Sequence, residues 1–181
     1  MKQAQEASTW PGAESSDPAP DLRTVDGFTA WIEPHWAAMA YLAARSGDDR
    51  DDILQEALAA AWRKRAQFDP SRGTARNWLL AITADQRWKA GRTAARRLAN
   101  LLRLTPQLDN LPEADGTRLD MERAVCRLPS RQRLAVELHY YLDLPITDMA
   151  QVMRCAEGTV KSTLSDARAR LRQLLGEDYQ R

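Results

Sequence analysis

The stretch from Pro145 to Leu175 constrains the fold of this chain more than any other. It contains two segments with apolar residues at helical spacing, separated by five residues, which leave room only for a turn. The apolar positions are Ile146, Met149, Ala150 and Met153 in the first segment and Val160, Leu164, Ala167, Leu171 and Leu175 in the second. Two short helices joined in this way predict a helix-turn-helix.

The second segment carries basic and hydroxyl residues away from its apolar face. Side chains of these types reach base edges and phosphates when a recognition helix lies in a major groove. They are Lys161, Ser162, Thr163, Ser165 and Arg168. We therefore expect this helix to read DNA.

The formal net charge of the 181 residues is only +1, but the charges are segregated. From Arg72 to Arg103, eight basic residues accompany a single acid, Asp85, which gives a local net charge of +7. Leu104 to Glu122 holds five acids and one arginine, a net charge of −4. A short charged run is usually a solvated helix face, but so long a basic stretch favours a surface that binds a polyanion.

Composition excludes several classes of protein. Cys126 and Cys155 lack metal-binding spacing, and only His35 and His139 could join them as soft ligands, so we expect no metal and no other cofactor. Both thiols are predicted to be reduced and in or near the core. No apolar run is long enough to cross a bilayer, and no signal-peptide pattern is present, which predicts a cytoplasmic protein without a membrane contact.

The N-terminal half reads as a tail followed by helices. Residues 1–22 contain few large apolar side chains and are predicted to be disordered, with a partner-binding peptide around Trp10 as the alternative. A helical stripe then runs from about Val25 to Arg45, and Pro34 is expected either to kink it or to mark a later helix start. The stripe consists of Phe28, Ile32, Trp36, Met39 and Ala43.

Four acids precede the next helix, which spans about Ile53 to Arg65. They are Asp48, Asp49, Asp51 and Asp52. As helix caps they complement the helix dipole, whereas in an enzyme they would bind magnesium. No second acid–base constellation accompanies them, so we favour the caps and expect no enzymatic activity. Gln55 and Glu56 should lie on the exposed face of this helix.

The segment from Phe68 to Thr74 has the composition of a turn. A helix should follow to about Ala99, with Trp78 and Ile82 in the core. Trp88 lies among basic residues and has two open interpretations. It either stacks on an unpaired base or packs against a neighbouring helix.

The C-terminal half begins after a break in periodicity. Residues 104–116 hold two prolines, a glycine and several acids, and we interpret them as a flexible acidic linker. A helix is predicted from about Thr117 to Cys126, and another begins at Leu128–Ser130. Its buried face should consist of Leu134, Leu138, Tyr141 and Leu142. The fold class is therefore all-α, with two small helical domains joined by the linker.

Two separate stretches resemble one family, the bacterial sigma-70 factors, and in particular their extracytoplasmic-function (ECF) group. The run DILQEALAAAW from Asp52 to Trp62, followed by FDPSRGT (68–74) and WLLAIT (78–83), is similar to sigma region 2. LPSRQR (128–133), DMA (148–150) and GTVKS (158–162) are similar to region 4. Both halves in this order make the resemblance specific.

The resemblance implies a role for each matching residue. The residues that would dock on core RNA polymerase are Asp52, Gln55 and Glu56. Binding of the melted −10 element falls to Phe68, Arg72, Asp85, Trp88, Lys89, Arg92 and Arg96. Reading of the −35 element falls to Lys161, Ser162, Thr163, Ser165, Asp166 and Arg168. The linker would thread toward the channels of the polymerase.

This chain departs from the family pattern at a few positions. Asp85 stands where asparagine is usual, and Thr163 and Asp166 stand where arginine is frequent. Ala156 replaces the usual Ser or Thr cap, which forgoes about 1 kcal/mol of helix stability. These changes bear on which promoter is read.

The sequence therefore predicts a promoter-specificity subunit of bacterial RNA polymerase, with a helix-turn-helix regulator that binds duplex DNA alone as the alternative. We expect a tail over 1–22, a region 2-like domain over 23–103, the linker, a region 4-like domain over 117–176 and a C-terminal tail over 177–181. Expected partners are the core enzyme, duplex and melted promoter DNA and an anti-sigma factor. Free of them, the protein should be a monomer.

Overall fold

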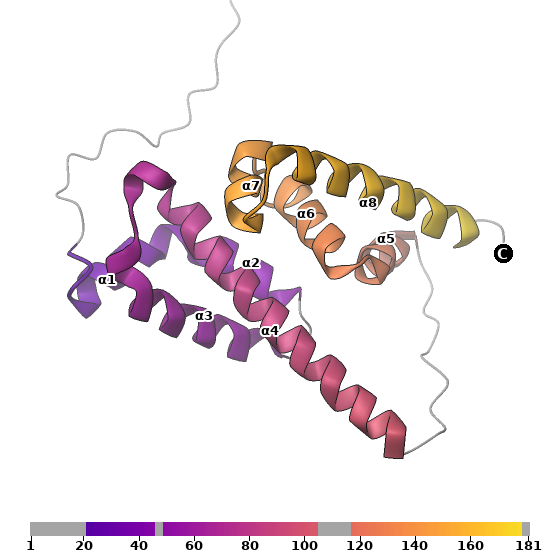
Figure 1. Cartoon of the computed structure of the whole chain (residues 1–181), viewed down its shortest axis with the longest axis horizontal. Helices are drawn as coiled ribbons and strands as arrows, with labels where there is room; N and C mark the ends of the chain where they lie inside the picture. Colours follow the sequence, from indigo (N-terminus) through magenta and orange to yellow (C-terminus); the bar gives the residue numbers. More distant parts are fainter. Residues whose placement is uncertain (1–20, 46–48, 105–116, 179–181) are drawn as a thin grey trace, which may run out of the picture.

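The computed structural model describes residues 21–45, 49–104 and 117–178, and all regular structure within them is helical (Figure 1). The predicted all-α class is therefore confirmed. The described part begins at Asp21, which a turn at Leu22 and Arg23 follows. The linker, apart from Leu104, and most of the predicted N-terminal tail lie outside the described residues, as do Asp48 and the three C-terminal residues.

In the N-terminal unit, the described residues 21–45 and 49–104 include four α-helices and the short 3-10 helices η1, η3 and η4. They are α1 (Val25–Ile32), η1 (Glu33–His35), α2 (Trp36–Ala44), α3 (Arg50–Lys64), η3 (Arg65–Gln67), η4 (Pro70–Arg72) and α4 (Ala75–Leu104). Thr24 caps α1, because its Oγ1 accepts a hydrogen bond from the Gly27 amide at 3.1 Å. Pro34 lies in η1, which interrupts the helix, and α2 starts after it at Trp36, as the alternative of a later start predicted.

The core of the N-terminal unit is formed where α2 and α3 pack against α4. The predicted residues Phe28, Ile32, Met39 and Ala43 are buried in it. Trp36, expected in the same stripe, is instead 45% exposed. The cause is the 3-10 turn, which has fewer residues per turn and rotates the start of α2 relative to α1.

The C-terminal unit, residues 117–178, is the predicted four-helix domain. Its helices are α5 (Thr117–Arg127), α6 (Ser130–Tyr140), α7 (Ile146–Met153) and α8 (Glu157–Asp178). Helices α7 and α8 form the helix-turn-helix, and Arg154 ends α7 in the left-handed conformation (φ 50°) with its amide directed to Ala150 and Gln151 carbonyls.

The buried face of α6 was predicted only in part. Leu134, Leu138 and Leu142 are buried, but Tyr141 is 45% exposed. Helix α6 ends at Tyr140, so Tyr141 leaves the helical register and its ring stacks on that of Tyr41, with 5.6 Å between centroids. Cys126 is exposed near the end of α5, contrary to the expected near-core position, whereas Cys155 is half-buried.

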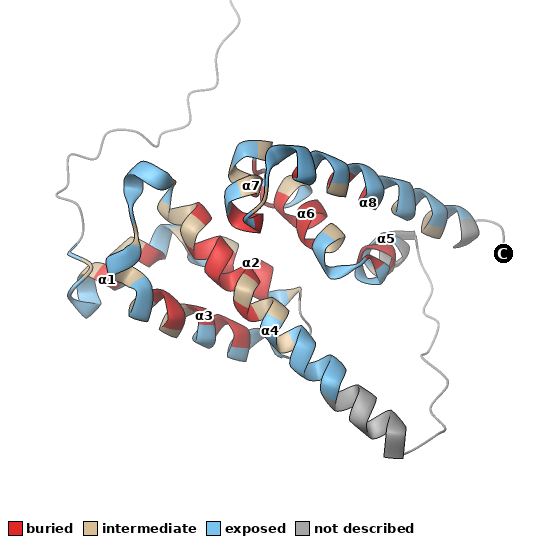
Figure 2. Cartoon of the chain, in the orientation of Figure 1, coloured by how far each residue is buried: buried red, intermediate tan, exposed pale blue. Residues whose placement is uncertain are grey.

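The two units pack against each other, with α7 lying on α4. A single apolar cluster crosses the boundary. It joins Leu42, Leu80 and Ala84 of the N-terminal unit to Leu134, Leu138, Met149, Val152 and Met153 of the C-terminal unit. Figure 2 shows the corresponding buried segments of α4 and α7 facing one another. The units therefore share a core instead of folding as two separate bodies.

None of the helices in the described part of the chain combines the length and apolar character that a membrane span requires. Likewise, no group of three or more His, Cys, Asp or Glu side chains among the described residues is arranged to hold a metal ion.

Replacing Leu164 by alanine should destabilise the C-terminal unit. This side chain is 2% exposed in the shared apolar cluster, and a deletion of this kind costs about 2–5 kcal/mol. Urea and thermal unfolding followed by circular dichroism measure the loss. The neighbouring Ser165→Ala variant is the control, because Ser165 is exposed and its replacement should change the unfolding free energy little. An equal effect of both substitutions would contradict the packing.

Candidate nucleic-acid and polymerase interfaces

The second helix of the helix-turn-helix presents two distinct faces. Val160, Leu164 and Ala167 are fully buried against the rest of the C-terminal unit. The opposite face carries the predicted reading residues Lys161, Ser162, Ser165, Asp166 and Arg168, which are exposed, and Thr163, which is half-buried. The predicted −35 residues are thus all accessible, and they spread over more than one side of α8, because successive helical residues differ by about 100° in direction.

Hydrogen bonds hold parts of this surface in place. The hydroxyls of Ser162 and Thr163 both donate to the Thr159 carbonyl oxygen, at 3.0 and 2.7 Å. Arg168 donates through Nε to Tyr140 Oη at 2.7 Å, and its guanidinium lies 5.7 Å from the centre of that ring. Tyr140 is 55% exposed and was not predicted as part of the site. Its contact with Arg168 joins residues 28 apart, which no local pattern shows.

The loop between α3 and α4 is held by Asp69. The backbone amide and hydroxyl of Ser71 donate to Asp69 Oδ1 at 2.9 and 2.7 Å. These bonds hold the pKa of Asp69 below its usual range. Gly73 then joins η4 to α4 with φ +155°. The loop is therefore a defined turn, as its composition predicted.

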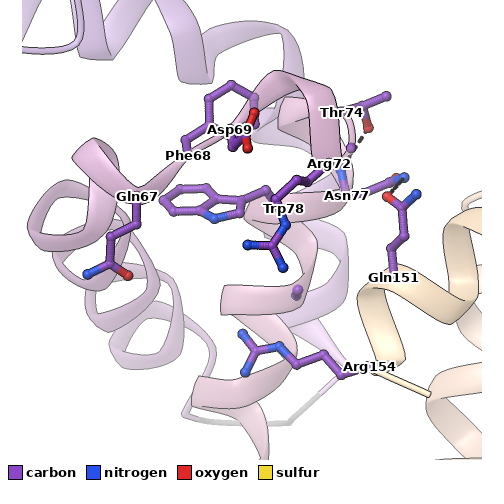
Figure 3. Close-up of a pocket in the computed structure, with 11 residues that line it drawn as sticks. Gln67, Phe68, Asp69, Arg72, Thr74, Asn77, Trp78, Gln151 and Arg154 are labelled. Carbon is purple, nitrogen blue, oxygen red and sulfur yellow. Dashed lines mark hydrogen bonds between the residues drawn. The ribbon is translucent and has the colours of Figure 1, made fainter.

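A cavity of about 350 Å³ opens beside this loop (Figure 3). Phe68 and Trp78 line it, with ring centroids 5.7 Å apart, and Arg72 lies at its rim. The centroid of the Trp31 ring lies 5.0 Å from that of Phe68. The aromatic side chains that form one connected group are Phe28, Trp31, Trp62, Phe68 and Trp78. Aromatic walls with an arginine suit an unstacked base.

The cavity wall also contains residues outside the predicted site, among them Asn77, Gln151 and Arg154. Asn77, from the first turn of α4, is 3% exposed. Gln151 and Arg154 come from α7, in the other unit, and reach toward the cavity (Figure 3). Asn77 Nδ2 donates to Gln151 Oε1 at 3.1 Å. Helical periodicity placed Asn77 in α4, but only the packing of the two units reveals its partner.

The α4 surface beyond the loop is partly covered. Asp85 forms an ion pair with Arg154, with 2.9 Å between Oδ2 and Nη2. Trp88 is half-buried against the shared apolar cluster, as the packing alternative predicted for this conformation. Trp88 and Arg92 also line a cavity of about 650 Å³ between the units. Arg96 is exposed further along α4.

The predicted polymerase-docking residues Asp52, Gln55 and Glu56 are exposed together on α3. They line a third cavity, of about 540 Å³, with Lys89 of α4. Lys89 therefore points away from Trp88, because successive helical residues differ by about 100° in direction. Arg92 and Arg96 follow Lys89 by three and seven positions and lie on the same side of α4 as Lys89.

The acids before α3 occupy its N-terminal end. Asp49 is the N-cap residue, but its side chain accepts no capping hydrogen bond. Asp51 and Asp52 lie in the first turn, where they complement the helix dipole, and Asp51 pairs with Arg50 at 3.2 Å. The acids lie where the sequence predicted them. They stabilise the helix through their charge and not through a capping hydrogen bond.

A buried carboxylate ties the two units together. Glu137 of α6 is fully buried and receives two hydrogen bonds from Arg87 of α4, one of them between Nη2 and Oε1 at 3.1 Å. Arg45 Nε lies 3.5 Å from the same Oε1. Arg76 adds a hydrogen bond from Nη2 to the Leu142 carbonyl oxygen at 2.8 Å. None of these contacts was predicted from the sequence.

Comparisons with known proteins agree with this architecture. Residues 33–98 match the family described as Sigma-70 region 2, and residues 118–171 match Sigma-70, region 4. The ECF RNA polymerase sigma factor SigM of Mycobacterium tuberculosis is 35% identical over 139 residues, 76% of this chain and 70% of the relative. RpoE of Cereibacter sphaeroides, also an ECF sigma factor, is 31% identical over 129 residues, 68% of this chain and 70% of the relative.

Two solved structures share the fold. The sigma factor RpoE in complex with the anti-sigma factor NepR from Bartonella quintana superposes with a TM-score of 0.65 and 25% identity, covering 84% of this chain and 98% of that one. CnrH in complex with the cytosolic domain of CnrY gives a TM-score of 0.60 at 24% identity, over 86% and 91%. Both family regions in order, with a relative of this identity and coverage, assign the chain to the ECF group of the sigma-70 family, the RNA polymerase sigma factors that recognise promoters as non-catalytic subunits.

Proposed function

We propose that the two units divide promoter recognition between them. The exposed face of α8 reads the −35 element in the major groove, and the loop cavity with the basic side of α4 holds the melted −10 strand. Asp52, Gln55 and Glu56 dock on core polymerase. We also propose that the protein acts in the cytoplasm and is held by an anti-sigma factor, as the sigma factor bound to NepR is.

The observation that carries this proposal is the cavity between Phe68 and Trp78. Opening a duplex requires no hydrolysis by the sigma factor. It requires a pocket that holds an unstacked base better than the stack does, offsetting a few kcal/mol of unstacking. The aromatic walls supply stacking, and the Arg72 guanidinium at the rim supplies an ionic contact to a phosphate.

The electrostatics of α4 and α8 support different tasks. Arg92 and Arg96 are exposed on α4 and suit phosphate contacts that are independent of sequence. On α8, Asp166 stands among the reading residues and weakens attraction to DNA. The −35 helix is therefore proposed to select the site while core polymerase supplies much of the affinity.

Transcription with purified components tests the proposal. The protein is added to core polymerase and a library of promoter fragments, and specific transcripts are sequenced. We expect a defined set of start sites that share −35 and −10 sequences. Stable binding to duplex DNA without polymerase, together with no transcripts in its presence, would instead indicate a helix-turn-helix regulator that acts alone.

Replacing Asp52, Gln55 and Glu56 together by alanine should weaken binding to core polymerase at least tenfold, about 1.4 kcal/mol, since all three lie exposed on one face of α3. Fluorescence anisotropy with labelled protein measures the affinity. Asp51→Ala is the matched control, because it removes an exposed acid from the same first turn. Equal affinities of the triple variant and the control for core polymerase would show that these residues do not dock on it.

Introducing arginine at Thr163 and Asp166 should strengthen binding to duplex DNA and shift the −35 preference. Each new phosphate contact steepens the dependence of log affinity on log salt by about 0.9. Selection from a randomised −35 library and salt titrations measure both effects. Met121→Arg with Glu122→Arg is the control, because these exposed α5 residues give the same charge change away from α8. If the double variant and the control select the same −35 sequences, α8 does not read the −35 element.

A further inference from the structure

We propose that Arg45 and Arg87 form a DNA phosphate site, which Glu137 occupies as an internal stand-in while Gln151 occupies the base cavity. The C-terminal unit thereby competes with the −10 strand for the same surface. This inference rests on the proposed function of the N-terminal unit. It adds a binding site outside the predicted set and a competitor for that site.

The Glu137 carboxylate is bound as a phosphate would be. Arg87 donates from both terminal nitrogens, one to each carboxylate oxygen, in the two-pronged arrangement that arginine forms with carboxylates and phosphates alike. Arg45 approaches the same group through Nε. Arg45 Nη2 is buried and has no hydrogen-bond partner among the described residues, so the pair of arginines has a donor for a further oxygen. A phosphate offers more acceptor oxygens than a carboxylate.

The two arginines belong to the N-terminal unit, whereas the carboxylate belongs to the other. When the units separate, two neighbouring guanidinium groups lose their shared anion, and their repulsion favours an anion in its place. The adjoining cavity is lined by Arg92 of α4 and by Arg131 and Arg133 of α6. Of these, Arg92 lines the same cavity as Arg45 and Arg87. A DNA strand is the anion whose repeated phosphates match the three arginines of the N-terminal unit along this cavity.

The base cavity is occupied by a second group of matching chemistry. The Gln151 carboxamide presents an amide edge like that of a nucleobase, and its Oε1 accepts a hydrogen bond from Asn77. Asn77 is 3% exposed, and no other partner for its Nδ2 is seen in the described structure. A Cβ added at Gly73 would lie 2.5 Å from Gln151 Oε1, which shows how closely this side chain fits the loop.

A third contact covers the acid that would read a base. Arg154 pairs with Asp85, the carboxylate positioned to accept a hydrogen bond from a cytosine amino group. Three polar groups of the C-terminal unit therefore lie on three proposed DNA-binding points of the N-terminal unit. The apolar cluster between the units adds to this closure, so the free protein should bind a −10 strand weakly until a partner separates them.

Binding of single-stranded DNA by the free full-length protein tests the inference. The probe is a fluorescent pool of random-sequence 12-nucleotide strands. Gln151→Ala with Arg154→Ala should raise the affinity at least fivefold, because both substitutions remove occupants without touching the N-terminal unit. Thr147→Ala, on the exposed side of α7, should leave it unchanged. An affinity of the double variant equal to that of the wild type would overturn the competition.

The phosphate site is tested separately. Glu137→Gln should also raise the affinity, because it removes the competing charge while keeping the shape of the side chain. Adding Arg45→Gln and Arg87→Gln to it should abolish the gain and reduce the slope of log affinity against log salt. Glu137→Gln with Arg63→Gln is the control, since Arg63 is exposed at the end of α3. Equal binding by the triple variant and Glu137→Gln would overturn the phosphate site, and circular dichroism confirms that each variant is folded.

Failure of this inference differs from failure of the proposed function. Wild-type protein that initiates transcription with core polymerase, but whose variants bind single strands no better, retains its function and lacks the internal competition. Protein that binds no single strand in any variant and gives no transcripts loses both proposals.

Discussion

The buried Glu137 carboxylate is the interaction on which the observed arrangement of the two units depends. A carboxylate without exposure to water is costly unless it is paired and hydrogen-bonded, and Arg87 and Arg45 supply both requirements from the other unit. Separating the units exposes the charges to water again, so much of the pairing energy is recovered as hydration. A buried ion pair therefore specifies the docked geometry more than it stabilises it.

Helix α4 connects this pairing to function because it contributes residues to most of the described contacts between the proposed promoter surface and the C-terminal unit. Its first turn supplies Asn77 to the base cavity, its middle supplies Asp85 and Arg87, and its later part carries the exposed arginines. On its other side it packs on α3, which carries the residues proposed to dock on core polymerase. One rigid helix thus borders the polymerase surface, the promoter surface and the other unit.

Local sequence patterns predicted the helices. They did not predict the contacts between residues that are distant in the sequence. Apolar spacing predicted α7 and α8, and Pro34 predicted the break between α1 and α2. Periodicity failed at Trp36, where a 3-10 turn changed the register. The ion pairs of Glu137 join residues 50 and 92 positions apart, so no sequence window contains both partners. The separation of Lys89 from Trp88 follows from helix geometry and was available from the sequence.

The weak basicity of α8 and the covered surface of α4 have the same proposed effect, which is to keep the affinity of the free protein for DNA low. A sigma factor that bound promoter DNA tightly when free would occupy promoters without initiating transcription. In the proposed mechanism, Asp166 lowers the affinity of α8 for DNA, and Glu137 with Gln151 fills the surface proposed for the −10 strand. Affinity then appears only when polymerase holds the units in a different arrangement, because binding energy from the core enzyme offsets the cost of separating them. On this basis, the residues that most reduce binding of promoter DNA by the free protein lie at the boundary between the units.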